Sequence, residues 1–128
     1  MTCKGGYVLI VDDDVYIQRA LVEIIGDDYG HGVKTANDGC EALRMLEGAP
    51  PPALILLDLM MPGMDGAEFI ARKNEIATLA RVPVCIMTAS KQGDSELARL
   101  AAAGPRHCSI LRKPFDLDAL MAIVELYC

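Results

Sequence analysis

Four short apolar runs, each ending at a polar residue, constrain the fold of this chain more than any other feature. Short apolar runs bounded by turn-forming residues are typical of buried parallel strands. Segments with the spacing of amphipathic helices separate them, which predicts an α/β fold with a doubly wound parallel sheet. These four runs predict strands over residues 7–12, 53–58, 83–88 and 107–112, and a short fifth strand is expected over 32–36.

Apolar periodicity and breaker residues locate five helices between and after these strands. The predicted helices cover residues 15–26, 39–47, 66–79 and 94–103, and the last begins at Asp116 as its N-cap. Gly26 and Gly30 are expected to bracket the end of the first helix, and Gly104-Pro105 to stop the helix over 94–103. The side chains expected to be buried are Ile17, Leu21, Ile24 and Ile25 in the first helix, Ala42, Leu43 and Leu46 in the second, Phe69, Ile70, Ile76 and Ala77 in the third, and Leu117, Leu120, Met121 and Val124 in the last.

The composition predicts one globular domain over residues 1–128 and argues against some classes of function. Hydrophobic residues make up 52% of the chain and charged residues 23%, enough to bury a core. A net charge of −6 argues against a broad nucleic-acid surface. No apolar stretch reaches the ~18 residues of a membrane span, and the five cysteines show no CxxC spacing. We therefore expect no membrane insertion and a reducing, cytoplasmic location.

Polar residues stand where the predicted strands end. They are Asp12 and Asp13 after the first strand, Asp58 on the third, Thr88 on the fourth and Lys113 after the fifth. In an open parallel sheet the ligand crevice lies outside the carboxyl ends of the strands. One edge of the sheet is therefore expected to hold carboxylates, a hydroxyl and an ammonium group, a set that suits a divalent cation and a phosphoryl group.

The run Asp12-Asp13-Asp14 has two interpretations. An aspartate at this point can act as the N-cap of the first helix, and Asp14 is the expected cap. Three adjacent carboxylates, however, repel one another unless a cation compensates their charge. Because Mg²⁺ often binds one or two carboxylates plus phosphate oxygens, Asp12 and Asp13 are predicted to bind it.

Asp58 also has two interpretations. Its carboxylate can accept hydrogen bonds from the next turn through Gly63 or Gly66. It can instead attack a phosphoryl group and form an aspartyl-phosphate, which requires a nearby cation such as one held by Asp12 and Asp13.

Thr88, Ala89 and Lys113 are candidates for binding the phosphoryl group. The Thr88 hydroxyl can donate to a phosphoryl oxygen, although threonine is common at strand ends, and the small Ala89 leaves room for the ligand. Lys113 can pair with Asp58 or with a phosphoryl oxygen, or it can extend its ammonium group to water.

These residues together resemble the receiver domain of two-component response regulators. The matching stretches are Val8–Asp14, Ala36–Leu43, Leu57–Gly66, Met87–Ala89 and Lys113–Phe115. Each is weak alone, but five in the family's order are specific and cover essentially the whole chain. The resemblance implies a flavodoxin-like fold, with a five-stranded parallel sheet in the order 2-1-3-4-5 and five helices.

The resemblance also implies a role for each site residue. Asp58 is the phosphoacceptor, and Mg²⁺ is bound by Asp12, Asp13, Asp58 and the backbone carbonyl of Met60. The phosphoryl oxygens are bound by Thr88, the Ala89 amide and Lys113. The phosphodonor is a histidine kinase or a histidine phosphotransfer protein, and the downstream protein binds the fourth helix, fifth strand and fifth helix. Such a domain assists its own phosphorylation and dephosphorylation and is not a turnover enzyme.

One position departs from the family pattern. Family members usually carry Tyr or Phe three residues before the lysine, where this chain has Ile110. The departure leaves the phosphate chemistry intact but puts the usual threonine–aromatic switch in doubt.

Two alternative functions use the same residues. A protein-interaction module that works without phosphorylation would be expected to lack a member of the acid, threonine and lysine set, and this chain has all of them. A phosphatase with an aspartyl nucleophile would need a second acid two residues after Asp58 as general acid, and that residue is Met60.

Overall fold

Five parallel strands form one sheet in the computed structural model, which describes residues 7–28, 32–58, 66–88, 108–112 and 117–127. The strands are β1 (Val8–Val11), β2 (Val33–Ala36), β3 (Leu54–Asp58), β4 (Val84–Thr88) and β5 (Cys108–Arg112). Their order is β2-β1-β3-β4-β5, and every neighbouring pair is parallel. The predicted strand order is confirmed, and each strand lies within the range expected from the sequence.

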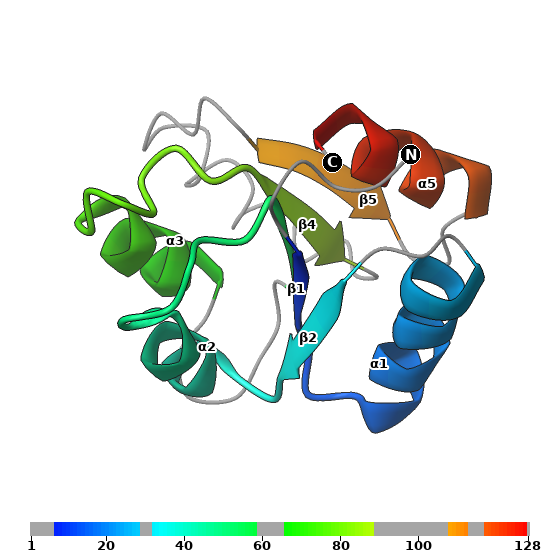
Figure 1. Ribbon diagram of the computed structural model, residues 1–128, viewed down its shortest axis with the longest axis horizontal. Helices are drawn as coiled ribbons and strands as arrows, with labels where there is room; N and C mark the ends of the chain where they lie inside the picture. The colour runs from blue at the N-terminus through cyan, green and yellow to red at the C-terminus, as the bar shows by residue number, and fades with distance from the viewer. Residues whose placement is uncertain (1–6, 29–31, 59–65, 89–107, 113–116, 128) are drawn as a thin grey trace.

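Helices cover both faces of this sheet, as the doubly wound prediction requires. They are α1 (Val15–Val22), the π-helical η1 (Glu23–Asp28), α2 (Gly39–Leu46), α3 (Gly66–Asn74) and α5 (Leu117–Tyr127). Figure 1 shows α1 and α5 on one side of the sheet and α2 and α3 on the other. The helix predicted over 94–103 and the Asp116 cap lie outside the described residues.

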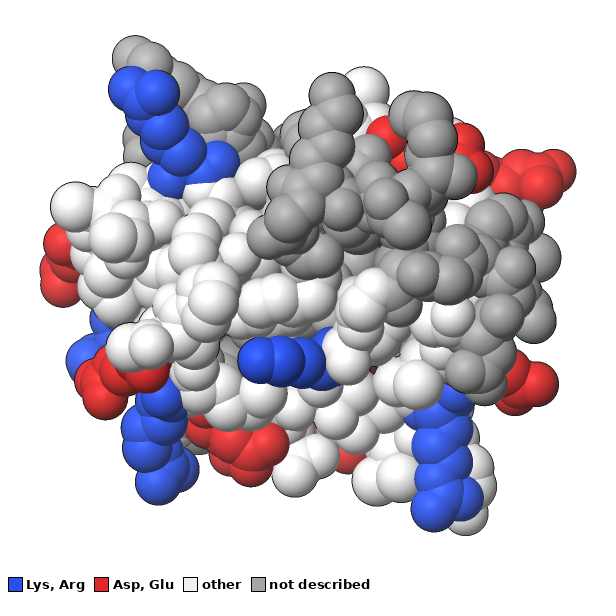
Figure 2. All heavy atoms as spheres, in the orientation of Figure 1, with Lys and Arg blue, Asp and Glu red and all other residues white. Residues whose placement is uncertain are grey.

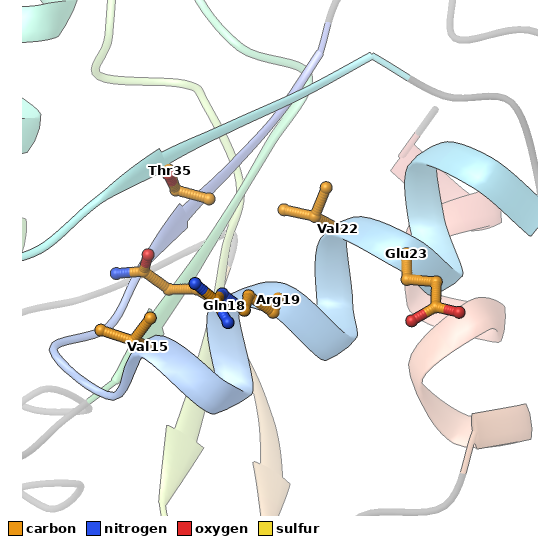
Figure 3. A pocket seen from close by; sticks show the side chains of 6 residues that line it. All are labelled: Val15, Gln18, Arg19, Val22, Glu23 and Thr35. Carbon is orange, nitrogen blue, oxygen red and sulfur yellow. The ribbon is translucent and has the colours of Figure 1, made fainter.

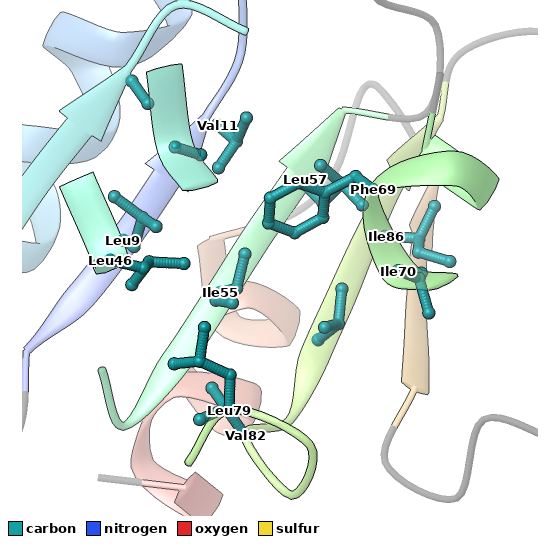
Figure 4. Packing of buried hydrophobic residues seen from close by; sticks show 13 residues of the cluster. Leu9, Val11, Leu46, Ile55, Leu57, Phe69, Ile70, Leu79, Val82 and Ile86 are labelled. Carbon is teal, nitrogen blue, oxygen red and sulfur yellow. The ribbon is translucent and has the colours of Figure 1, made fainter. Parts of the chain in front are cut away.

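Strand side chains alternate between two apolar layers, because successive residues of a strand point to opposite faces. Leu9, Leu57 and Ile86 pack in the layer that contains residues of α2 and α3, including Phe69 (Figure 4). The other layer contains Ile10, Leu56 and Met87 with residues of α1, η1 and α5. The predicted helix residues that are buried are Leu21, Ile25, Ala42, Leu46, Phe69, Ile70, Leu120, Met121 and Val124. Ile17, Ile24, Leu43 and Ile76 are partly buried against these layers, and the side chain of Leu117 lies outside the described residues.

The first helical segment ends at Asp28, between Gly26 and Gly30 as predicted, but its last part is not regular α-helix. Regular α-helix stops at Val22, and π-helical η1 continues through Gly26 to Asp28. Glycine and aspartate are weak helix formers, and acidic residues are unfavourable at a helix C-terminus. Ile25 nevertheless remains fully buried, so the irregular segment still packs against the sheet.

The third helix is shorter than the predicted 66–79. Beyond Asn74 the backbone forms tight turns, with N–H groups of Glu75 and Ile76 donating three residues back. Lys73, only 3% exposed, donates from Nζ to the Ala80 carbonyl at 3.0 Å and holds this turn against the helix. As a result Ala77 is exposed, contrary to the prediction, and Leu79 takes a buried position instead.

The pairing register places the carboxyl ends of the central strands side by side. Val11 of β1 pairs with Leu57 of β3, so the next residue of each strand, Asp12 and Asp58, falls at the same edge. Thr88 ends β4 at this edge and pairs with Arg112 of β5. The fold therefore brings together residues that are far apart in the sequence.

The layer around Phe69 should contribute strongly to stability. Phe69 is fully buried, and Phe→Ala substitutions in packed cores typically cost about 3–5 kcal/mol. We expect Phe69→Ala to lower the free energy of unfolding, measured by urea denaturation, by this amount. Leu126→Ala is the control, because Leu126 is 71% exposed and surface substitutions usually change stability by less than about 0.5 kcal/mol. Equal losses in the two variants would contradict this description of the core.

Candidate functional site

Three carboxylates meet at the carboxyl edge of the sheet. Ligand oxygens of Asp12, Asp13 and Asp58 all lie within 4.8 Å of one another. Asp12 is fully buried and Asp58 is 8% exposed, whereas Asp13 is exposed to solvent. The predicted proximity of these residues is confirmed, and it follows from the β1–β3 register.

Asp12 is fixed by hydrogen bonds from both its backbone and its side chain. Its N–H donates to the Ala36 carbonyl at 3.1 Å, which extends the contact between β1 and β2 by one residue. Its Oδ1 accepts from the backbone N–H of Asp14 at 2.9 Å. These hydrogen bonds restrain the position of the Asp12 carboxylate.

Asp14 has the capping role predicted for it. Its Oδ1 accepts from the backbone N–H of Tyr16 at 2.9 Å and of Ile17 at 3.4 Å, which satisfies donors at the start of α1. Because this oxygen serves the helix, Asp14 is not one of the three clustered carboxylates. The capping interpretation is thus confirmed for Asp14, and the cation-binding interpretation of Asp12 and Asp13 stays a prediction.

The donor set of the cluster matches a hard divalent cation. Mg²⁺ prefers oxygen ligands and commonly binds through one or two carboxylates while keeping waters and phosphate oxygens. Three carboxylates this close repel one another, and two of them are buried, so a cation would relieve an unfavourable interaction. Asp12, Asp13 and Asp58 are suited to hold such an ion.

The other predicted site residues lie largely outside the described part of the chain. Thr88 is the last residue of β4, but its side chain lies outside the described residues, as do Met60, Ala89 and Lys113 altogether. Their roles as phosphoryl or metal ligands therefore stay predictions. Ile110 lies on β5 paired with Ile86, and its side chain is also outside the described part of the chain.

Sequence reasoning missed Gln18, a buried polar residue beside the cluster. Gln18 is 8% exposed, and its amide contacts the backbone that leads to the acidic residues. The signal was present, because Gln18 has helical spacing with the buried Leu21 and Ile25. A polar residue on the buried face of a helix needs a hydrogen-bonding partner, and the loop after β1 provides it.

The described surface carries mixed charges. On the face shown in Figure 2, basic and acidic side chains are interspersed. In the described portion of the chain, no helix combines the length and the apolar character needed to cross a membrane.

Comparisons with known proteins identify the family of this chain. The family model for the response regulator receiver domain matches residues 8–125. The response regulator MprA of Mycobacterium leprae is 36% identical over 118 residues, which are 92% of this chain and 49% of that protein. The chain thus spans about half the length of the curated relatives it matches.

Solved structures share the fold. The chemotaxis protein CheY4 of Vibrio cholerae has a TM-score of 0.79 and 29% identity, with 96% of this chain and 98% of that chain covered. A response regulator receiver protein from Pseudomonas putida has a TM-score of 0.82 at 23% identity, covers 94% and 96% of the two chains, and supports the fold alone. On the matched residues, the sheet order and the acidic cluster, the chain belongs to the response regulator receiver domain family.

Proposed function

We propose that this chain is a phosphoryl-accepting signalling switch in which Asp58 takes a phosphoryl group from a histidine kinase or a histidine phosphotransfer protein. The observation that carries the proposal is the convergence of Asp12, Asp13 and Asp58 within 4.8 Å at one sheet edge. Family membership supports it, because receiver domains typically bind Mg²⁺ at an acidic pocket.

The transfer converts Asp58 into an aspartyl-phosphate. A carboxylate oxygen of Asp58 bonds to phosphorus, the bond from phosphorus to the donor's histidine nitrogen breaks, and its electron pair leaves with the histidine. Bound Mg²⁺ would neutralise charge on the carboxylates and the phosphoryl oxygens. The chain's part is to position the acids, and positioning and charge stabilisation are most of what phosphoryl transfer requires.

The proposal extends to residues that complete the site. Thr88, the Ala89 amide and Lys113 would bind the phosphoryl oxygens, and the Met60 carbonyl would complete the protein ligands of Mg²⁺. The position of Thr88 at the end of β4, one strand from Asp58, supports its assignment.

Output is proposed to pass through a protein-interaction surface. In this proposal residues 1–128 form a single cytoplasmic receiver domain that assists its own phosphorylation and dephosphorylation without turning over an external substrate. The surface would comprise β5, α5 and the segment 94–103, where the sequence predicts a helix, and its target would be a downstream protein. The alternative is a module on the same fold that binds partners without phosphorylation. Phosphorylation of Asp58 distinguishes the two functions.

Asp58 should be the one residue that is phosphorylated. Incubation with acetyl phosphate and Mg²⁺ should add a single phosphate to the wild-type protein, measured by intact mass, and none to Asp58→Asn. Asp118→Asn is the control, because Asp118 is an exposed aspartate on α5, and its adduct should match that of the wild type. An adduct that persists in Asp58→Asn, or none on the wild type, would contradict the proposal.

Mg²⁺ binding should depend most on Asp13 and less on Asp12, since the Asp12 carboxylate is also engaged by the Asp14 N–H. Loss of a ligand should weaken affinity at least as much as loss of a supporting contact, which is typically about 10–100-fold. Asp13→Asn should therefore lower Mg²⁺ affinity by at least about tenfold in titration calorimetry. It should also raise the metal-free unfolding free energy by a few tenths to about 1 kcal/mol, because a repulsive charge is removed. Unchanged affinity in Asp13→Asn, with Asp118→Asn as the matched control, would refute the metal site.

Ile110 should weaken the response of the output surface to phosphorylation. A ligand shifts a conformational equilibrium only through its different interactions with the two states, and Ile110 offers no ring or hydroxyl to sense the position of Thr88. Beryllofluoride, a phosphoryl mimic, should shift backbone amide resonances near residues 90–93 more than those of 107–111 and α5. Ile110→Tyr should enlarge the shifts in the latter group. Large shifts through 107–111 and α5 that are undiminished in Ile110→Ala would contradict this prediction.

A further inference from the structure

Gln18 is a polar residue of α1 with a buried side chain, and it lies close in sequence to the acidic residues Asp12 and Asp13. It is 8% exposed and extends from α1 into the space between that helix and β2 (Figure 3). A groove of about 400 Å³ opens there, lined by Val15, Gln18, Arg19, Val22, Glu23 and Thr35. Gln18 thus forms part of the contact between the helix and the edge strand.

The side-chain amide of Gln18 contacts three oxygen atoms at the ends of two strands. Nε2 donates to the backbone carbonyl of Asp12 and, at 2.9 Å, to Oδ1 of Asn37, and it lies 3.4 Å from the carbonyl of Ala36. All three partners are acceptors, and a neutral amide nitrogen offers two hydrogens to them. One side chain therefore joins the residue after β1 to the last residue of β2 and to the residue that follows it.

The hydrogen bonds of Gln18 act on Asp12, which other hydrogen bonds of the loop after β1 also hold in place. The Asp12 N–H donates to Ala36, and the Asp14 N–H donates to the Asp12 carboxylate. The donation from Gln18 adds a constraint on the Asp12 carbonyl, which belongs to the peptide that leads directly into Asp13. Both carboxylates of the acid pair are thereby attached to a backbone that Gln18 restrains.

We propose that Gln18 is a positioning residue that orients the Asp12–Asp13 peptide so that both carboxylates converge with Asp58 on a divalent cation. This inference rests on the proposed function for its consequence, although the hydrogen bonds of Gln18 themselves involve only protein atoms. Asn37 is the second point of attachment, and through it Gln18 also links the acidic loop to the start of α2, where Asp38 caps the helix.

The physical reason is that a buried hydrogen-bond donor restrains the backbone carbonyl that accepts from it, because losing that hydrogen bond in the protein interior is costly. A side chain of equal length without a donor would fill the same volume but leave the Asp12–Asp13 peptide free to rotate. Groups that orient metal ligands typically contribute about 10–100-fold to metal affinity, although they do not touch the ion. We therefore expect removal of the Gln18 donor to weaken Mg²⁺ binding even when a side chain of equal length preserves the packing of α1.

The test compares Gln18→Met, which keeps length and removes the donor, with Arg19→Met. Arg19 lines the same groove and is exposed, so the control introduces the same side chain one position further along α1. Titration calorimetry should show Mg²⁺ affinity about tenfold lower in Gln18→Met and unchanged in Arg19→Met. Far-ultraviolet circular dichroism and urea denaturation establish that both are folded at the temperature used. Unchanged affinity in a folded Gln18→Met protein would overturn the proposal, because a merely structural role would lower only the unfolding free energy.

A metal-free measurement separates this inference from the proposed function. Without Mg²⁺, Gln18→Met should shift the backbone amide resonances of Asp12, Asp13 and Asn37 in two-dimensional NMR and leave those of β3 in place. If Gln18→Met does not fold, Gln18→Glu, which has the same shape and places a carboxylate against the three oxygens, should produce the same local shifts. Unperturbed resonances at Asp12, Asp13 and Asn37 would overturn the positioning role. Failure of the wild-type protein to bind Mg²⁺, with these shifts present, would refute the proposed function instead.

Discussion

The parallel pairing of β1 with β3 is the constraint on which the rest of this structure depends. The register of Val11 with Leu57 fixes where each strand ends, and the residue after each pair is an aspartate. A slip of one residue would exchange side chains between the two apolar layers, so packing on both faces holds the register. The position of the acidic cluster is therefore set by the burial of apolar strand residues and not by interactions of the carboxylates themselves.

This arrangement places like charges together in a partly dry environment. Asp12 and Asp58 are buried at the end of the sheet, and Asp13 adds a third carboxylate within 4.8 Å. Such a cluster is unfavourable without a compensating cation, since burial strengthens repulsion between carboxylates. The apolar layers offset this cost, and a bound divalent cation would relieve the repulsion between the carboxylates.

Three consecutive aspartates have three different environments because the chain turns there from strand to helix. Asp12 continues the sheet and is buried, Asp13 faces solvent within the cluster, and Asp14 caps α1. Gln18 lies one turn further along α1, where its amide reaches back to the Asp12 carbonyl. The helix that Asp14 starts thus supplies the side chain that restrains Asp12, and the capping and positioning contacts support each other.

Local apolar periodicity and turn chemistry account for the alternation of strands and helices, most of the buried helix residues and the acids at the strand ends, so the sequence alone predicts these features. Helix ends were less predictable, since the turn after Asn74 depends on the contact of Lys73 with Ala80. Only the tertiary structure decided which aspartates converge and that Gln18 joins two strand ends. Those outcomes depend on the distances between residues far apart in the chain, and strand register and helix packing fix these distances.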